Sequence, residues 1–81
     1  MGIEYKIRFS VPEGYSTDRL LCKLPAQQST PGQMPAYDFA LESDGFYFID
    51  HLGQAAVAAQ ALRALIDEAL GFGEVVQISE L

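Results

Sequence analysis

The stretch that decides the fold runs from Tyr37 to Leu70 and reads YDFALESDGFYFIDHLGQAAVAAQALRALIDEAL. Its first half, up to Asp50, alternates apolar and polar residues, is interrupted by Ser-Asp-Gly and continues with aromatic residues. This pattern is typical of a β-hairpin. The second half places alanine and leucine at helical spacing and predicts an amphipathic helix over residues 54–70. A strand pair followed by a long helix indicates an α+β protein.

Two registers are open for this hairpin. A two-residue turn at Asp44 and Gly45 places Leu41 opposite Phe48. A three-residue turn with a bulge places Leu41 opposite Tyr47 instead. Because a shift of one residue exchanges the two faces of a strand, the aromatic side chains that point inward depend on the turn.

The returning strand of the hairpin is apolar at four successive positions, from Phe46 to Ile49. Two of these side chains must face each side of the sheet. One helix covers only one side, so the other side needs cover from a second copy of the chain, from another protein or from segment 12–36. An uncovered apolar patch of this kind marks an interface.

Strands are also expected at both ends of the chain, over residues 3–11 and 74–80. Segment 17–24 fits either a short helix, with Leu20, Leu21 and Leu24 inward, or a strand. A helix there gives the order βαββαβ, which is ferredoxin-like, and a strand gives a five-stranded sheet with one helix. In both cases we expect one domain over residues 1–81. It is a two-layer sandwich, with a mostly antiparallel sheet of about four strands and the helix on one face.

The expected helix has one apolar face and two marked ends. Asp50 is a candidate N-cap and Gly71 a natural stop, and Arg63 and Asp67 can pair one turn apart on the polar side. At about 100° per residue, one face collects the following residues: Ala55, Ala58, Ala59, Leu62, Leu65, Ile66, Ala69 and Leu70.

The charge of the chain is negative and unevenly distributed. The formal net charge is -6, and residues 37–81 contain eight acidic residues against Arg63 alone. Nucleic acids and anionic membranes attract basic surfaces, so neither is an expected partner. No stretch is apolar enough to span a membrane. A basic protein partner is electrostatically permitted.

The chemistry available to the chain is sparse, since it has one histidine and one cysteine. A structural zinc site needs four such ligands, so no metal site is expected within one chain, and no cofactor motif is present. We interpret Cys22 as a buried, inert thiol and His51 as part of the turn between strand and helix. A lone thiol fits a reducing compartment, which favours a cytoplasmic protein.

These patterns favour a small acidic protein-interaction module without evident catalysis, acting as a homodimer or on a basic protein partner. The interaction candidates are Tyr47, Asp38, Glu42 and Asp50, an aromatic anchor among carboxylates. The alternative is a small-molecule-binding or catalytic domain with a pocket between the sheet and loop 12–36. Its reactive candidates are Cys22 and His51, and no catalytic residue is assigned.

Overall fold

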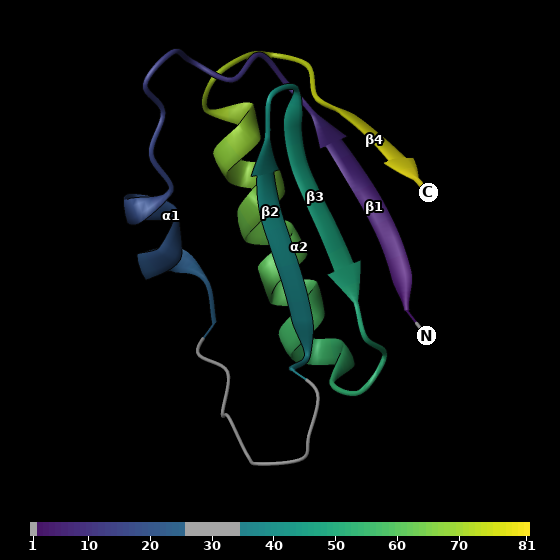
Figure 1. The fold of residues 1–81 in the computed structure, drawn as a ribbon. Helices are drawn as coiled ribbons and strands as arrows, with labels where there is room; N and C mark the ends of the chain where they lie inside the picture. Colours follow the sequence, from purple (N-terminus) through teal and green to yellow (C-terminus); the bar gives the residue numbers. More distant parts are fainter. Residues whose placement is uncertain (1, 26–34) are drawn as a thin grey trace.

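The computed structural model describes residues 2–25 and 35–81 and contains one sheet and two helices within them (Figure 1). The elements follow in this order: β1 (Ile3–Arg8), α1 (Asp18–Lys23), β2 (Tyr37–Glu42), β3 (Gly45–Asp50), α2 (Ala55–Leu70) and β4 (Gln77–Glu80). The sheet order is β2-β3-β1-β4, and each neighbouring pair is antiparallel. The predicted α+β class is confirmed, with a four-stranded antiparallel sheet and a long helix compatible with a two-layer sandwich.

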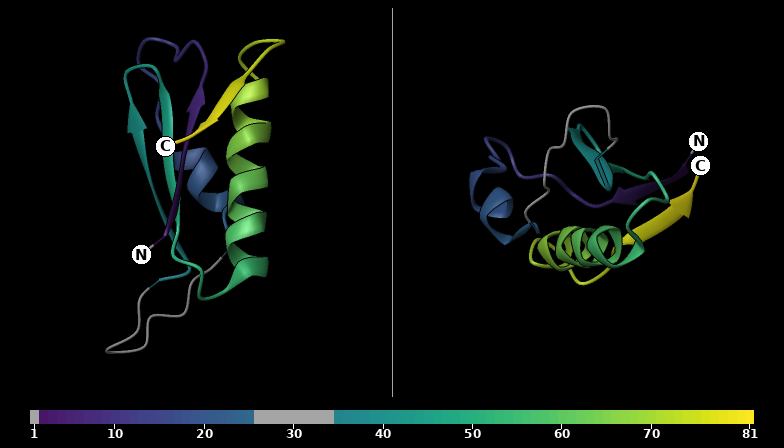
Figure 2. Two further views of the ribbon diagram at one scale, coloured as in Figure 1. Left: turned by 90° about the vertical axis from the view of Figure 1, so that its right-hand side faces the viewer. Right: turned by 90° about the horizontal axis from the view of Figure 1, so that it is seen from below.

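Segment 17–24 contains a short helix, α1, so the five-stranded alternative is wrong for the described residues. α1 lies beside α2, on the same side of the sheet (Figure 2). It buries Leu20 completely but leaves Leu21 half exposed, because six residues make fewer than two turns and present one side chain to the core. Residues 26–34 of the expected loop 12–36 lie outside the described residues.

The hairpin takes neither of the two expected registers. Leu41 pairs with Phe46 and Glu42 pairs with Gly45, so the turn consists of Ser43 and Asp44. Gly45 is therefore the first residue of β3 rather than a turn residue. A Cβ at this position would lie 1.9 Å from the carbonyl oxygen of Ile7 in the neighbouring strand β1. The glycine is required by close strand packing, which explains why turn chemistry alone predicted the wrong register.

The register places the phenylalanine side chains of β3 inward and its two other apolar residues outward. Phe46 and Phe48 are almost completely buried between the sheet and α2, whereas Tyr47 and Ile49 are half-buried on the opposite face. The buried residues form one hydrophobic cluster: Ile7, Phe9, Leu20, Ala36, Tyr37, Phe46, Phe48, Ala58, Ala61, Leu65 and Ala69.

The buried stripe of α2 is narrower than the predicted apolar face and rotated away from it. Its fully buried residues are Ala58, Ala61, Leu65 and Ala69, and Ala61 was not expected among them. On the other flank, Leu70 is 45% exposed, and the remaining predicted residues are half-buried or exposed: Ala55, Ala59, Leu62 and Ile66. Part of the apolar face of α2 therefore lacks cover from the described chain.

Both predicted ends of α2 need correction in their detail. Asp50 does not cap the helix, because Gln54 holds the N-cap position and makes no side-chain bond there. The Asp50 carboxylate instead accepts a hydrogen bond from the backbone of Leu52 at 2.7 Å, which stabilises the turn. Gly71 does end the helix, but in right-handed rather than left-handed backbone geometry.

Candidate functional site

Three of the four predicted interaction residues lie on one face of the sheet. We call this the outer face, the side of the sheet that points away from α2. Tyr47, Asp38 and Glu42 share this face. Strand pairing places Asp38 opposite Ile49 in β3, and it places Tyr47 opposite Lys6 in β1. Asp50 pairs with Tyr37 and points to the opposite side. The four residues therefore do not form one surface.

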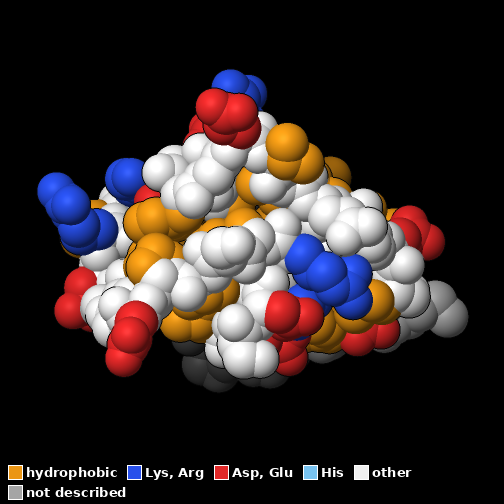
Figure 3. Space-filling model, turned by 90° about the horizontal axis from the view of Figure 1, so that it is seen from above, with side chains coloured by type: hydrophobic (Ala, Val, Ile, Leu, Met, Phe, Trp, Pro, Cys, Tyr) orange, Lys and Arg blue, Asp and Glu red, His pale blue; other side chains and the backbone are white. Residues whose placement is uncertain are grey.

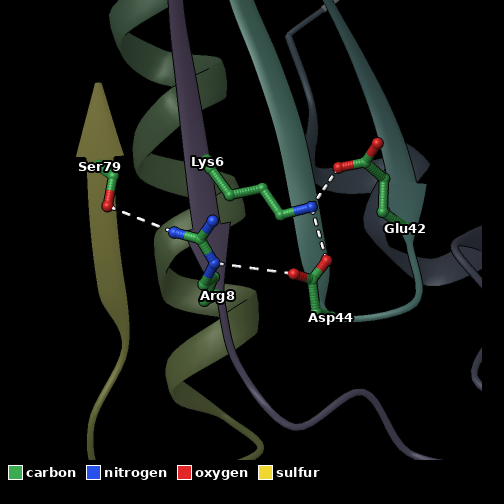
Figure 4. Close-up of polar contacts among 5 residues, drawn as sticks. All are labelled: Lys6, Arg8, Glu42, Asp44 and Ser79. Atoms are coloured by element: carbon green, nitrogen blue, oxygen red, sulfur yellow. Dashed lines mark hydrogen bonds and ion pairs between the residues drawn. The ribbon is translucent and has the colours of Figure 1, made fainter. Parts of the chain in front are cut away.

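Glu42 belongs to an ion-pair cluster on the outer face that is centred on Lys6 (Figure 4). Lys6 is 7% exposed and contacts both Glu42 and Asp44, the latter at 2.6 Å. Arg8 approaches Asp44 at 3.7 Å from the same strand. The bonds to Asp44 and Glu42 raise the pKa of the Lys6 ammonium above its ordinary value, and the bond to Lys6 lowers the pKa of the Asp44 carboxyl. These carboxylates thus already have a cationic partner.

Tyr47 and Asp38 are likewise engaged within the chain. The hydroxyl of Tyr47 donates a hydrogen bond to Glu4 at 2.5 Å, which raises the pKa of the phenol. Asp38 lies 2.8 Å from the Nε2 atom of His51. An outer face whose polar groups pair with each other presents less unsatisfied charge to a partner than the sequence suggests.

Cys22 and His51 lie on different sides of the sheet. Cys22 is exposed on α1, so its interpretation as a buried thiol is wrong. Its position on a short helix whose inward residue is Leu20 explains the exposure. His51 follows β3, where its ring is 11% exposed next to Asp38. The proposed nucleophile and base therefore do not meet.

An uncovered apolar surface lies on the inner side of the sheet, where α2 and β4 diverge. α2 packs against β1, β2 and β3 but not against β4. As a result, Ile78 of β4 is 45% exposed, although its strand partner Ile7 is fully buried. We call Leu62, Ile66 and Leu70 of α2 together with Ile78 of β4 the α2–β4 surface. Leu62 and Ile66 are its half-buried floor, because both also pack against the core, whereas Leu70 is 45% exposed.

The sequence contains a signal for this surface, although none of its residues was predicted as an interaction residue. The predicted apolar face of α2 is wider than one side of a small sheet can cover, and its excess flank is the one that remains uncovered.

Figure 3 views the end of the molecule where α2 finishes and the hairpin turns. Hydrophobic side chains reach the surface there, between groups of charged ones.

A pocket of about 560 Å³ lies between α1 with its preceding residues and the C-terminal end of α2. Its lining includes Tyr15, Asp18, Arg19, Lys23, Glu68 and Phe72. The alternative hypothesis placed a pocket between the sheet and loop 12–36 with Cys22 and His51, and neither residue lines this one. No local pattern could identify it, since it forms only when α1 meets the end of α2.

Glu68 is the polar centre of this pocket and is largely shielded from solvent. Its side chain is 11% exposed and accepts a hydrogen bond from the Tyr15 hydroxyl at 2.6 Å. Its other oxygen lies 3.3 Å from the ammonium of Lys23. Burial and the bond to Glu68 raise the pKa of Tyr15 well above its ordinary value, because the neighbouring carboxylate disfavours a second negative charge.

Residues 2–25 and 35–81 contain neither a cluster of metal ligands nor a helix that could span a membrane. Within these ranges no three His, Cys, Asp or Glu side chains are grouped closely enough to hold a metal ion. Neither described helix combines the length and the apolarity needed to cross a bilayer.

Comparison of the chain with family models, with curated proteins and with solved structures finds no match.

Proposed function

We propose that this protein is a protein-binding module, and that it binds an extended segment combining apolar and basic side chains on the α2–β4 surface. The observation that carries the proposal is the exposure of Leu70 and Ile78, each 45% exposed, at the place where α2 leaves β4 uncovered. Apolar side chains gathered in this way on a small protein are a recognised mark of an interaction site.

The position of β4 supports an extended partner. β4 is the last strand of the sheet order and pairs only with β1, so its outer edge carries no strand among the described residues. A free edge offers backbone N–H and C=O groups to an added strand. Such a strand would place alternate side chains beside Ile78 on the inner side of the sheet, where α2 gives no cover.

The charge around the surface favours a basic partner over a second copy of the chain. Glu80 points to the same side as Ile78, and Glu74 precedes Val75. Neither glutamate forms an ion pair with another described residue. Two copies, each with a net charge of -6, would bring like charges together, whereas lysine or arginine in a partner would be attracted.

A random peptide library displayed on phage and selected on the full chain tests this proposal. Enriched peptides are expected to alternate apolar residues with Lys or Arg. Their affinity should fall at least about tenfold with Ile78→Asp, and it should fall as well with Glu74→Lys and Glu80→Lys. Matched controls at other exposed positions, Leu21→Asp on α1 and Glu13→Lys, should leave the affinity unchanged.

Three results would overturn the proposal. The first is that no peptide is enriched, or that the enriched peptides bind the Ile78→Asp variant equally well. The second is a concentration-dependent dimer in sedimentation that Ile78→Asp dissociates, which makes a second copy the partner. The third is a loss of binding in Asp38→Lys with none in Ile78→Asp, which returns the site to the outer face and to Tyr47.

We also infer that the fold is ferredoxin-like. The inference is supported by the element order β1-α1-β2-β3-α2-β4 together with the sheet order β2-β3-β1-β4. An experimental structure with a different strand order would contradict it. The topology by itself says nothing about function.

A further inference from the structure

The pocket between α1 and the end of α2 holds four charged side chains, and two of them are already paired. Lys23 and Glu68 lie 3.3 Å apart, and the Tyr15 hydroxyl bonds the second oxygen of Glu68. These groups satisfy each other. The Glu68 carboxylate, although largely shielded from solvent, therefore has its charge compensated within the protein.

Asp18 and Arg19 are the two charged groups of the pocket that remain unpaired. Neither side chain forms an ion pair or a side-chain hydrogen bond with another described residue. They are neighbours in the first turn of α1, and both line the pocket. The pocket is therefore lined by one carboxylate and one guanidinium that have no partner among the described residues.

The remaining wall of the pocket is aromatic. Phe72 is 39% exposed, and its ring meets that of Tyr15 edge to face, with the ring centroids 5.1 Å apart. Phe9 stacks against Phe72 at 6.0 Å and supports it from the core. Figure 3 shows basic side chains next to hydrophobic surface on the α1 side of the molecule. A ring or branched aliphatic group can pack on this wall.

We propose that this pocket binds a small zwitterion with an apolar side chain, namely an α-amino acid of the aromatic or large aliphatic class. Its carboxylate pairs with the guanidinium of Arg19, which suits two parallel hydrogen bonds. Its ammonium pairs with Asp18, and its side chain lies against Phe72. The volume of about 560 Å³ is within the usual range for small-molecule sites.

The unpaired charges of Asp18 and Arg19 disfavour a ligand that is only an anion or only a cation. A plain anion would meet Arg19 but would also face the unpaired carboxylate of Asp18, and a plain cation would face Arg19. A zwitterion satisfies both groups and leaves the Lys23–Glu68 pair intact. The site is independent of the α2–β4 surface, because no residue belongs to both.

The first test is a titration of the isotope-labelled full chain with L-phenylalanine, followed by NMR. Saturable shifts are expected at the amides of Ser16, Arg19 and Phe72. N-acetyl-L-phenylalanine lacks the ammonium and L-phenylalaninamide lacks the carboxylate. Each should bind about tenfold more weakly or worse, as expected when one charge-assisted hydrogen bond is lost.

Variants of the two unpaired groups give the second test. Asp18→Asn and Arg19→Gln should each weaken L-phenylalanine binding about tenfold, and both positions are exposed, so the fold should tolerate the changes. In Arg19→Gln, L-phenylalaninamide should bind as well as L-phenylalanine, because the carboxylate has lost its partner. Arg63→Gln is the control, since Arg63 pairs with Asp67 elsewhere on α2.

Several outcomes would overturn the proposal. One is the absence of saturable shifts at the pocket up to the solubility of L-phenylalanine. Another is equal binding of N-acetyl-L-phenylalanine, which would indicate an anion site. A third is unchanged affinity in both variants, with native spectra showing that they are folded.

Discussion

Gly45 illustrates how a single residue can determine strand pairing. It begins β3 with φ at 150°, a backbone conformation that side chains rarely adopt, and its α-carbon faces the carbonyl of Ile7. Any side chain would collide with β1 as well as strain the backbone. The glycine therefore determines how closely the two central strands approach each other.

We expect Gly45→Ala to destabilise the protein by roughly 1–3 kcal/mol from the backbone conformation alone, and more from the collision with β1. Gly53→Ala is the matched control. A Cβ at Gly53 meets nothing within 4 Å, and its φ is not in the left-handed range, so its effect should stay within about 1 kcal/mol. Urea denaturation of both variants measures the difference. Equal losses in the two would contradict this account of Gly45.

The Tyr15 hydroxyl links stability to alkaline pH. In the unfolded chain tyrosine loses its proton near pH 10, whereas burial and the bond to Glu68 keep the folded pKa higher. The folded state therefore holds a proton that the unfolded state has released. The stabilisation from Tyr15 is fully present below pH 10 and is lost as the pH rises above it.

Tyr15→Phe should lower the free energy of unfolding by about 1–2 kcal/mol near neutral pH, because a bond to a charged acceptor is lost. It should also reduce the additional loss of stability above pH 10. Urea denaturation at neutral and alkaline pH, in wild type and variant, measures both effects. Parallel pH profiles would show that Tyr15 is not the group responsible.

Among single residues, local pattern predicted a contact within one helix correctly, but it predicted the surroundings of other side chains wrongly. The pairing of Arg63 with Asp67 is confirmed at 3.3 Å, because residues four apart on a helix are always neighbours. Asp50 and Cys22 were misplaced, one as a helix cap and the other as a buried thiol. Their surroundings come from distant parts of the chain, to which local pattern is insensitive.

At the scale of elements, α2 shows the difference between an apolar face and a buried one. Its type and extent follow from the sequence, and the predicted range 54–70 differs by one residue from Ala55–Leu70. The buried stripe is shifted toward Ala61 because α1 packs on one flank while β4 does not reach the other.

Two leucines on α2 test this rotation. Leu65→Ala should cost about 2–5 kcal/mol, because Leu65 is completely buried and its truncation leaves a cavity. Leu70→Ala should cost less than about 1 kcal/mol, because Leu70 is 45% exposed. Thermal or urea denaturation compares them. A cost for Leu70→Ala equal to that for Leu65→Ala would mean that the α2–β4 surface is covered in solution.

In the molecule as a whole, the central strands of the sheet have more pairing partners than the edge strand β4. β3 and β1 each pair on both sides, whereas β4 is four residues long and pairs only with β1. Stability should therefore decrease from the centre of the sheet toward β4. β4 is the strand to which we propose that a partner adds, and it is the strand of the sheet that a partner would stabilise most.

Amide hydrogen exchange of the full chain should show this gradient. The slowest amides are expected in β3 and β1, and β4 should exchange faster than both. A peptide selected on the α2–β4 surface should slow exchange in β4 while leaving α1 unchanged. Protection of β4 equal to that of β3 in the free protein would contradict the prediction.

The sequence by itself determined the α+β class, the hairpin and the helix over 54–70, because these depend on periodicities within one segment, and it left segment 17–24 open between a helix and a strand. Only the tertiary structure decided the hairpin register, the uncovered flank of α2 and the meeting of Tyr15 with Glu68. Each depends on contacts between residues far apart in the chain. Their geometry follows from packing and close approach, which no local pattern records.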